Sequence, residues 1–188
     1  MTSTPPFCVP KTIALVGLMG AGKSSIGRRL AQCLALPFTD ADTEIEIAAG
    51  FSIEEIFARD GEAAFRSGER RVIARLLDSP IQVLATGGGA FMDAETRTLI
   101  RQRAISIWLK ADLDVLMARV ARRTNRPLLK GGDPRAVLAR LIETRYPVYA
   151  EADITVESAE GPPEATLAKV MAALEEFLGA TAGAGASP

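Results

Sequence analysis

Residues 17–24, with the sequence Gly-Leu-Met-Gly-Ala-Gly-Lys-Ser, constrain this chain more than any other segment. A short apolar run at residues 13–16 precedes them, and Ile26, Leu30 and Leu34 follow at helical spacing. A strand, a glycine-rich turn and a helix therefore meet here, which is the context of a phosphate-binding P-loop. The glycines let consecutive backbone N–H groups point into one hollow, where the positive end of the helix dipole favours an anion.

Two side chains of this segment carry the expected chemistry. Lys23 is expected to reach the β- and γ-phosphates of a nucleoside triphosphate, and the Ser24 hydroxyl to bind Mg²⁺. The alternative is a chance match, for which the chain's own residue frequencies give roughly 0.4% before the strand–helix context is required. The sequence therefore predicts a triphosphate site at this turn.

Short apolar runs alternate with helical patterns along the whole chain. After the first strand, further strands are expected at residues 36–39, 81–86, 104–109 and 154–156. Helices are expected at 24–35, 43–49, 52–60, 62–77, 93–103, from 113, 133–147 and 163–178. This alternation predicts an α/β fold, a five-stranded parallel sheet with helices on both faces. Ligands of such sheets bind beyond the carboxyl ends of the strands, where three motif-bearing turns converge.

The composition excludes several classes of protein. The 188 residues, 48% hydrophobic and 24% charged, are typical of one globular domain, and a net charge of −1 argues against nucleic-acid binding. No apolar run reaches membrane-spanning length and no signal peptide is evident, so we expect a cytoplasmic protein. We also expect it to be a monomer. Cys8 and Cys33 lie in no CxxC pair, and Cys33, near the apolar face of the first helix, is expected to be buried and reduced.

Histidine is absent. Its absence excludes Ser-His-Asp triads, HExxH zinc sites and phosphohistidine chemistry, and leaves a carboxylate as the best general base. Asp40 and Asp42 follow the second strand, so one is expected to hold Mg²⁺ through its waters while the other accepts the proton of a substrate hydroxyl. The alternative is a solvated turn with a helix N-cap.

Two other segments have the composition of ligand contacts. Gly87-Gly88-Gly89 follows the third strand and suggests that a ligand presses on the backbone there, although a flexible turn would look the same. Arg119, Arg122, Arg123 and Arg126 precede Gly131-Gly132, which suits a lid over a triphosphate or a merely solvated loop.

Arg66 and Arg145 each lie in a helix beside an inward-facing residue. Their planar guanidinium groups suit a carboxylate substrate better than lysine would. Most surface arginines only solvate a helix, and the sequence alone does not separate the two interpretations for either residue.

Six segments taken together resemble the shikimate kinase family. They are Gly-Leu-Met-Gly-Ala-Gly-Lys-Ser-Ser, Phe-Thr-Asp-Ala-Asp, Gly-Glu-Ala-Ala-Phe-Arg, Thr-Gly-Gly-Gly-Ala, Asn-Arg-Pro-Leu-Leu and Thr-Arg-Tyr-Pro-Val-Tyr. They follow the family's order from about residue 11 to 157 and are specific as a set, whereas the P-loop alone indicates only a nucleotide.

The resemblance implies a three-layer P-loop kinase fold, similar to nucleoside monophosphate kinases. One domain would span residues 11–178, with a substrate-binding segment at about 40–77 and a lid at about 119–132. Residues 1–10 would be a flexible lead-in and 179–188 a disordered tail. The implied reaction transfers the γ-phosphoryl group of ATP to the 3-hydroxyl of shikimate, with Mg²⁺ as cofactor.

The resemblance also assigns roles to residues on the nucleotide side. The residues that would wrap the phosphates are Gly20, Ala21, Gly22, Lys23, Ser24 and Ser25. Ser24 would bind Mg²⁺ and Asp40 would act on the metal through water. Arg126 would contact the ATP phosphates and Arg119 would lie near the adenine, although the segment between them varies in length within the family. Ser25 stands where the family often has Thr, which keeps the hydroxyl.

On the substrate side, the resemblance makes Asp42 the base and a contact of the shikimate hydroxyls. Arg66 and Arg145 would hold the shikimate carboxylate, and Gly88 would offer its backbone N–H. No Asp follows the third strand, so a conventional Walker B partner is missing there, and Asp40 is the natural substitute.

Three alternatives stay open to different degrees. Another small-molecule P-loop kinase, for gluconate or a nucleotide, would keep Lys23 and Ser24. A GTPase switch would need DxxG and NKxD motifs, which the chain lacks, since its one Asn, Asn125, precedes Arg. A P-loop scaffold without activity is compatible with the sequence, although every expected catalytic residue is present.

Overall fold

The computed structural model describes residues 7–121 and 133–184. Its strands are β1 (Thr12–Val16), β2 (Phe38–Asp40), β3 (Val83–Ala85), β4 (Ala104–Lys110) and β5 (Ile154–Glu157). They form one parallel sheet in the order β2-β3-β1-β4-β5. This confirms the predicted five-stranded parallel sheet and places β1, which leads into the P-loop, at its centre.

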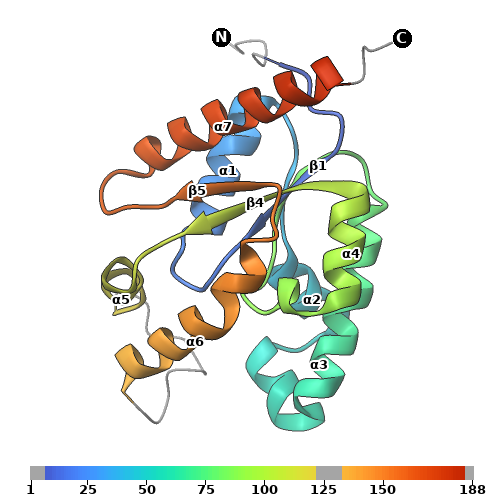
Figure 1. The fold of residues 1–188 in the computed structure, drawn as a ribbon. Helices are drawn as coiled ribbons and strands as arrows, with labels where there is room; N and C mark the ends of the chain where they lie inside the picture. The colour runs from blue at the N-terminus through green and yellow to red at the C-terminus, as the bar shows by residue number, and fades with distance from the viewer. Residues whose placement is uncertain (1–6, 122–132, 185–188) are drawn as a thin grey trace.

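The helices cover both faces of this sheet. They are α1 (Lys23–Leu34), α2 (Ala41–Ala49), α3 (Ile53–Leu77), α4 (Ala94–Arg103), α5 (Leu113–Ala121), α6 (Pro134–Tyr149) and α7 (Pro163–Ala184), with a 3₁₀ turn, η1 (Ala90–Met92). Helices α1 and α7 pack on each other, and α3 packs on α4 on the other side of the sheet (Figure 1). The three-layer arrangement is the one that the sequence predicts.

Local sequence explains where these helices begin and bend. Ser52 and Glu55 form the capping box of α3, and Asp93 caps α4 through the Thr96 N–H. The two helical pieces expected on either side of Gly61 are joined in α3, with a kink where Gly61 has φ of 80°.

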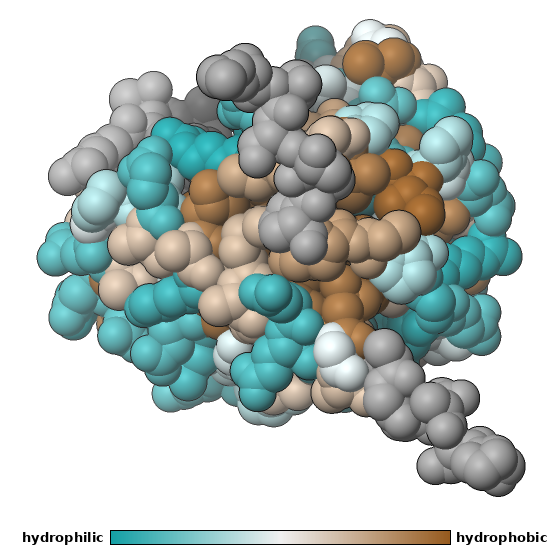
Figure 2. All heavy atoms as spheres, turned by 90° about the horizontal axis from the view of Figure 1, so that it is seen from above, coloured by the Kyte–Doolittle hydropathy of each residue, from teal (hydrophilic) through white to brown (hydrophobic). Residues whose placement is uncertain are grey.

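The core consists of the strands and the inward faces of the helices. Every residue of β1 and β3 is buried, as the continuous apolar runs of a sheet covered on both sides require. Figure 2 shows the molecule from above, with apolar residues gathered across the middle and hydrophilic residues around them. No helix within the described ranges is long and apolar enough to cross a membrane.

Three expectations differ from the structure. Helix α7 continues to Ala184, past the expected end at residue 178, because the alanines that follow Gly179 are strong helix formers. Helix α6 runs through Pro147 to Tyr149 instead of ending at the proline. Cys33 is exposed, not buried, since the inward stripe of α1 consists of Ile26, Gly27, Leu30, Ala31 and Leu34.

Candidate active site

The P-loop joins β1 to α1 through a backbone that only glycine adopts easily. Gly17, Gly20 and Gly22 have φ of 135°, 82° and 99°. A Cβ at Gly17 would lie 2.7 Å from the Leu109 carbonyl oxygen, and a Cβ at Gly20 would lie 3.0 Å from Val120 Cγ2. The loop therefore packs tightly against the end of β4 and against α5, which fixes the path of its backbone.

Lys23 and Ser24, the first residues of α1, join this helix to the start of the P-loop and to β2. The Lys23 ammonium donates to the carbonyl oxygens of Gly17 at 2.7 Å and Leu18 at 3.0 Å. Ser24 Oγ donates to Asp40 Oδ2 at 2.6 Å, which joins the start of α1 to the end of β2. A hydroxyl and a carboxylate at this distance, beside a phosphate hollow, are hard oxygen ligands of the kind that Mg²⁺ prefers.

Asp40 makes two contacts, and one of them is the helix N-cap that the sequence offers as an alternative. While its Oδ2 accepts from Ser24, its Oδ1 accepts from the Asp42 N–H at 3.1 Å and caps α2. Within the described ranges, no cluster of three or more His, Cys, Asp or Glu residues could hold a metal. Any Mg²⁺ here would therefore need phosphate oxygens and waters to complete its ligands.

The triple glycine lies among charged side chains from three helices, α2, α3 and α6. A Cβ at Gly87 would lie 2.7 Å from Asp42 Oδ1 of α2, and one at Gly89 would lie 2.5 Å from Arg66 Nη1 of α3. The Gly88 carbonyl accepts from Arg145 Nη1 of α6 at 2.9 Å. The absence of a side chain at Gly87 and Gly89 leaves room for these charged groups, and the expected substrate residues converge on this turn.

Glu69 is a buried acid that the sequence did not single out. Its Oε2 accepts from Arg66 Nη1 at 2.7 Å, and a Cβ at Gly87 would lie 2.9 Å from its Oε1. Burial raises the pKa of Glu69 above its ordinary value, and the nearby Asp42 adds to the increase, although Arg66 opposes it. Its spacing of three residues from Arg66 on one helix face was the only signal in the sequence.

Tyr149 is a second residue of the site that the sequence did not reveal. It is fully buried, and its hydroxyl donates to the same Gly88 carbonyl that Arg145 contacts. Burial raises the pKa of Tyr149 to about 12, so the hydroxyl keeps its proton and remains a donor. Arg145 and Tyr149, four residues apart on α6, thus fix the orientation of Gly88 together.

Arg119, at the end of α5, reaches the back of the P-loop. Its Nη1 donates to the carbonyl oxygens of Gly20 at 3.3 Å and Ala21 at 3.2 Å. Burial lowers the pKa of Arg119, while the carboxylate of Glu160 opposes this shift. Beside it lies a hollow of about 500 Å³, lined by Ala118, Arg119, Glu160 and Gly161.

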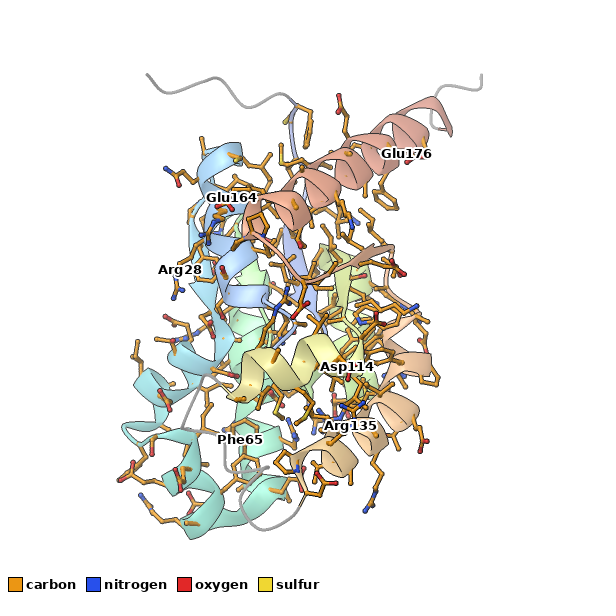
Figure 3. All side chains as sticks on the ribbon, turned by 90° about the vertical axis from the view of Figure 1, so that its left-hand side faces the viewer. Arg28, Phe65, Asp114, Arg135, Glu164 and Glu176 are labelled. Atoms are coloured by element: carbon orange, nitrogen blue, oxygen red, sulfur yellow. The ribbon has the colours of Figure 1, made fainter. Side chains whose placement is uncertain are left out.

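The remaining predicted contacts are placed only in part. Ser25 Oγ accepts from Arg29 Nη1 at 2.8 Å and keeps its own proton as a donor. Arg122, Arg123, Arg126 and most of the predicted lid lie outside the described residues. On either side of that gap, Asp114 of α5 and Arg135 of α6 form an ion pair at 2.7 Å (Figure 3).

Comparison with known proteins decides the family. The family model described as shikimate kinase matches residues 19–175. The chain belongs to the shikimate kinase family. A shikimate kinase of Caulobacter vibrioides is 61% identical over 166 residues, which cover 88% of this chain and 83% of the relative. One of Paramagnetospirillum magneticum is 60% identical over 170 residues, covering 90% and 87%.

Solved structures agree with this family. The shikimate kinase from Acinetobacter baumannii in complex with shikimate matches with a TM-score of 0.85 and 38% identity, over 88% of this chain and 93% of that one. A gluconokinase from Sinorhizobium meliloti matches with a TM-score of 0.60 and 20% identity, over 89% and 93%, and shares the fold.

Proposed function

We propose that this protein transfers the γ-phosphoryl group of ATP to the 3-hydroxyl of shikimate, forming shikimate 3-phosphate and ADP. One arrangement carries the proposal. A Cβ on Gly88 would lie 3.4 Å from the Met19 backbone nitrogen and 3.8 Å from Arg145 Nη1. Gly88 therefore lies in contact range of both the P-loop and this arginine. An acceptor held by Arg145 and Arg66 would therefore lie next to the terminal phosphate.

The substrate half of the site suits a carboxylate that carries several hydroxyls. Arg66 and Arg145 come from α3 and α6 and meet at Gly88 and Gly89, where two guanidinium groups offer forked donors to one carboxylate. The Asp42 carboxylate lies at the neighbouring Gly87, where it would accept a hydroxyl proton. We assign residues 40–77 as the substrate-binding segment, because they supply Asp42 and Arg66.

The nucleotide half suits Mg²⁺ and ATP. Backbone N–H groups of residues 20–25 would hold the phosphates, the Ser24 hydroxyl would ligate Mg²⁺, and Asp40 would hold its waters. When bound, the ion would neutralise charge on the β- and γ-phosphate oxygens. Lys23 would turn from the Gly17 and Leu18 carbonyls toward the γ-phosphate, and Arg119 would border the base.

The reaction then needs positioning and charge more than covalent chemistry. The 3-hydroxyl oxygen forms a bond to the γ-phosphorus while the bond from that phosphorus to the ADP oxygen breaks, and the hydroxyl proton passes to the Asp42 carboxylate. Phosphoryl transfer goes through a loose transition state, so fixed donors such as Lys23 stabilise the charge on the transferred oxygens. We place this reaction in the cytoplasm and assign it to the monomer.

A coupled ADP-release assay tests the proposal, with shikimate, gluconate and nucleoside monophosphates as separate acceptors. Shikimate should give the highest kcat/KM by a wide margin, since two arginines and Asp42 would all contact it. Faster turnover of gluconate would favour the alternative, a small-molecule kinase for a different carboxylate. Turnover of a nucleoside monophosphate alone would contradict both.

A further inference from the structure

Ser158 is a buried hydroxyl that none of the roles above uses. It follows β5 directly, is only 2% exposed, and its N–H donates to the Lys110 carbonyl at 2.7 Å. Its Oγ donates to the Ala21 carbonyl of the P-loop at 2.9 Å. The end of β5 is thus joined to a loop that lies more than a hundred residues earlier in the chain.

Arg119 completes this arrangement. Its Nη1 donates to Ser158 Oγ at 2.9 Å and also contacts the Ala21 carbonyl at 3.2 Å, while its Nη2 donates to the Ala159 carbonyl at 2.7 Å. Ser158 Oγ therefore donates one hydrogen bond and accepts another at a buried position. Without the Ser158 hydroxyl, the Arg119 guanidinium would lose one of the acceptors that hold it beside the P-loop.

The consequence concerns the peptide between Ala21 and Gly22. In a trans peptide the carbonyl and the N–H point in opposite directions, and the described chain has no cis peptides. Because Ser158 and Arg119 hold the Ala21 oxygen on the back of the loop, the Gly22 N–H faces the opposite side. That side is the hollow in which the phosphates would bind.

We propose that Ser158 is a positioning residue for the polyphosphate of the nucleotide. Its hydroxyl sets the orientation of the Ala21–Gly22 peptide, and it holds Arg119 against the loop. The proposal rests on the proposed function only in naming ATP as the anion that occupies the hollow. Ser158 touches no reacting atom, and its effect passes through the loop backbone.

The test measures binding directly, without turnover. Calorimetric titration of Ser158→Ala with Mg·ATP should show an affinity about 5- to 10-fold below that of the unchanged protein, the cost of one lost hydrogen bond. Inorganic tripolyphosphate, which has no base, should lose affinity to a similar extent. Shikimate affinity should change by less than about 2-fold, because Gly88 and the arginines are untouched.

Two further variants separate positioning from a loss of structure. Ser158→Thr keeps the hydroxyl and should restore most of the nucleotide affinity. Ser106→Ala is the matched control, because Ser106 is also a buried serine, donating to Asp153 at 2.6 Å away from the P-loop. It should lower stability and leave both affinities unchanged. If Ser158→Ala does not fold, Ser158→Cys, of similar size but with a weak donor, takes its place.

Distinct outcomes would overturn the proposal. A folded Ser158→Ala protein with unchanged affinity for ATP would do so, and so would an equal loss for ATP and shikimate. A loss of affinity for ATP without one for tripolyphosphate would mean that Ser158 acts on the binding of the base and not through the loop backbone. Should the unchanged protein fail to phosphorylate shikimate while the ATP titrations behave as expected, the proposed reaction would fall and the role of Ser158 would stand.

Discussion

Arg66 and Glu69 form an ion pair at 2.7 Å in which the acid is far more buried than the base. The Glu69 side chain is 3% exposed and the Arg66 side chain 25%. Removing a charged group from water costs free energy, and the attraction to one partner offsets this cost only in part. Such a pair therefore contributes more to orientation than to stability. Here the pair holds the guanidinium of Arg66 on Gly89, where it faces the expected carboxylate of the substrate.

The first prediction follows from the buried acid. Because the pKa of Glu69 is raised in the folded protein above its ordinary value of 4.5, the native state keeps this proton over a pH range in which the unfolded state has lost it. The free energy of unfolding should therefore fall as pH rises from that value through the folded pKa. Glu69→Gln keeps a hydrogen-bond acceptor for Arg66 but does not titrate, so its profile should lack this fall.

Urea unfolding of both proteins in steps from about pH 4 to about pH 8 measures the difference. Glu62→Gln is the matched control, because Glu62 contacts the same arginine at 3.4 Å but is 70% exposed. This variant still contains the buried acid, so the fall of the unfolding free energy with pH should remain. Parallel profiles for Glu69→Gln would contradict the raised pKa.

The second prediction concerns the two arginines. Arg66→Lys or Arg145→Lys keeps the charge but loses the two-pronged geometry. Losing one charge-assisted hydrogen bond costs about 1.5–3 kcal/mol, so shikimate affinity should fall by roughly 10- to 100-fold. ATP affinity should barely change. Separate binding titrations with shikimate and with ATP measure the two affinities. Arg140→Lys is the control, because Arg140 is an exposed arginine of α6.

If either arginine variant instead weakens ATP and spares shikimate, the carboxylate contact is wrong. The assignment of the substrate would then weaken as well, because it rests on these two side chains.

Tyr149 provides the third prediction. Tyr149→Phe removes the donor to Gly88 and should lower the free energy of unfolding by about 1 kcal/mol. With a pKa of about 12, the hydroxyl stays protonated, so the difference between the two proteins should be constant from about pH 6 to about pH 9. Shikimate affinity should fall a few-fold, since Gly88 would be held by Arg145 alone.

Tyr146→Phe is the control, because the Tyr146 hydroxyl donates to the Ala111 carbonyl and not to Gly88. It should lose similar stability and keep its shikimate affinity. A stability difference for Tyr149→Phe that grows with pH in this range would mean that the tyrosine titrates and would contradict the raised pKa.

The parts of this molecule that the sequence predicted are those with local causes. The P-loop turn, the parallel sheet and the starts of the helices near residues 52 and 93 follow from short patterns, and the structure confirms them. By contrast, the pairing of Arg145 with Gly88 spans 57 positions. Local patterns offered Arg145 and the triple glycine as separate candidates, and only the family resemblance assigned both to one substrate.

Glu69, Tyr149 and Ser158 were missed for a related reason. Each is an ordinary polar residue in the sequence and becomes important only through burial, which depends on how α3, α6 and the end of β5 pack against the glycine turns. For Cys33 the sequence led to the opposite error, because burial was expected and the residue is exposed. Its position beside Leu34 suggested burial, yet the side chain lies outside the inward stripe of α1.

The fourth prediction concerns Lys23. Lys23→Met should lower turnover by about 10²- to 10³-fold, since it removes a charged donor from the transferred phosphoryl group. Its two hydrogen bonds to loop carbonyls are only part-buried, so the free energy of unfolding should change by less than about 1 kcal/mol. Lys11→Met, at an exposed lysine that contacts the Gln102 carbonyl, is the control. Normal turnover of shikimate by Lys23→Met would mean that the nucleotide site has been misplaced.

The last prediction separates Asp42 from the arginines. Asp42→Asn keeps the shape of the side chain but cannot accept the hydroxyl proton, so kcat should fall by about 10²- to 10⁴-fold. Shikimate affinity should change only modestly, because Arg66 and Arg145 still hold the carboxylate. The Asp42 charge helps to raise the pKa of Glu69, so the same variant should lower that pKa. Steady-state kinetics, ligand titrations and the pH profile of unfolding test the three statements on one protein. A variant that keeps its kcat but loses shikimate affinity would make Asp42 a binding group and leave the reaction without an identified base.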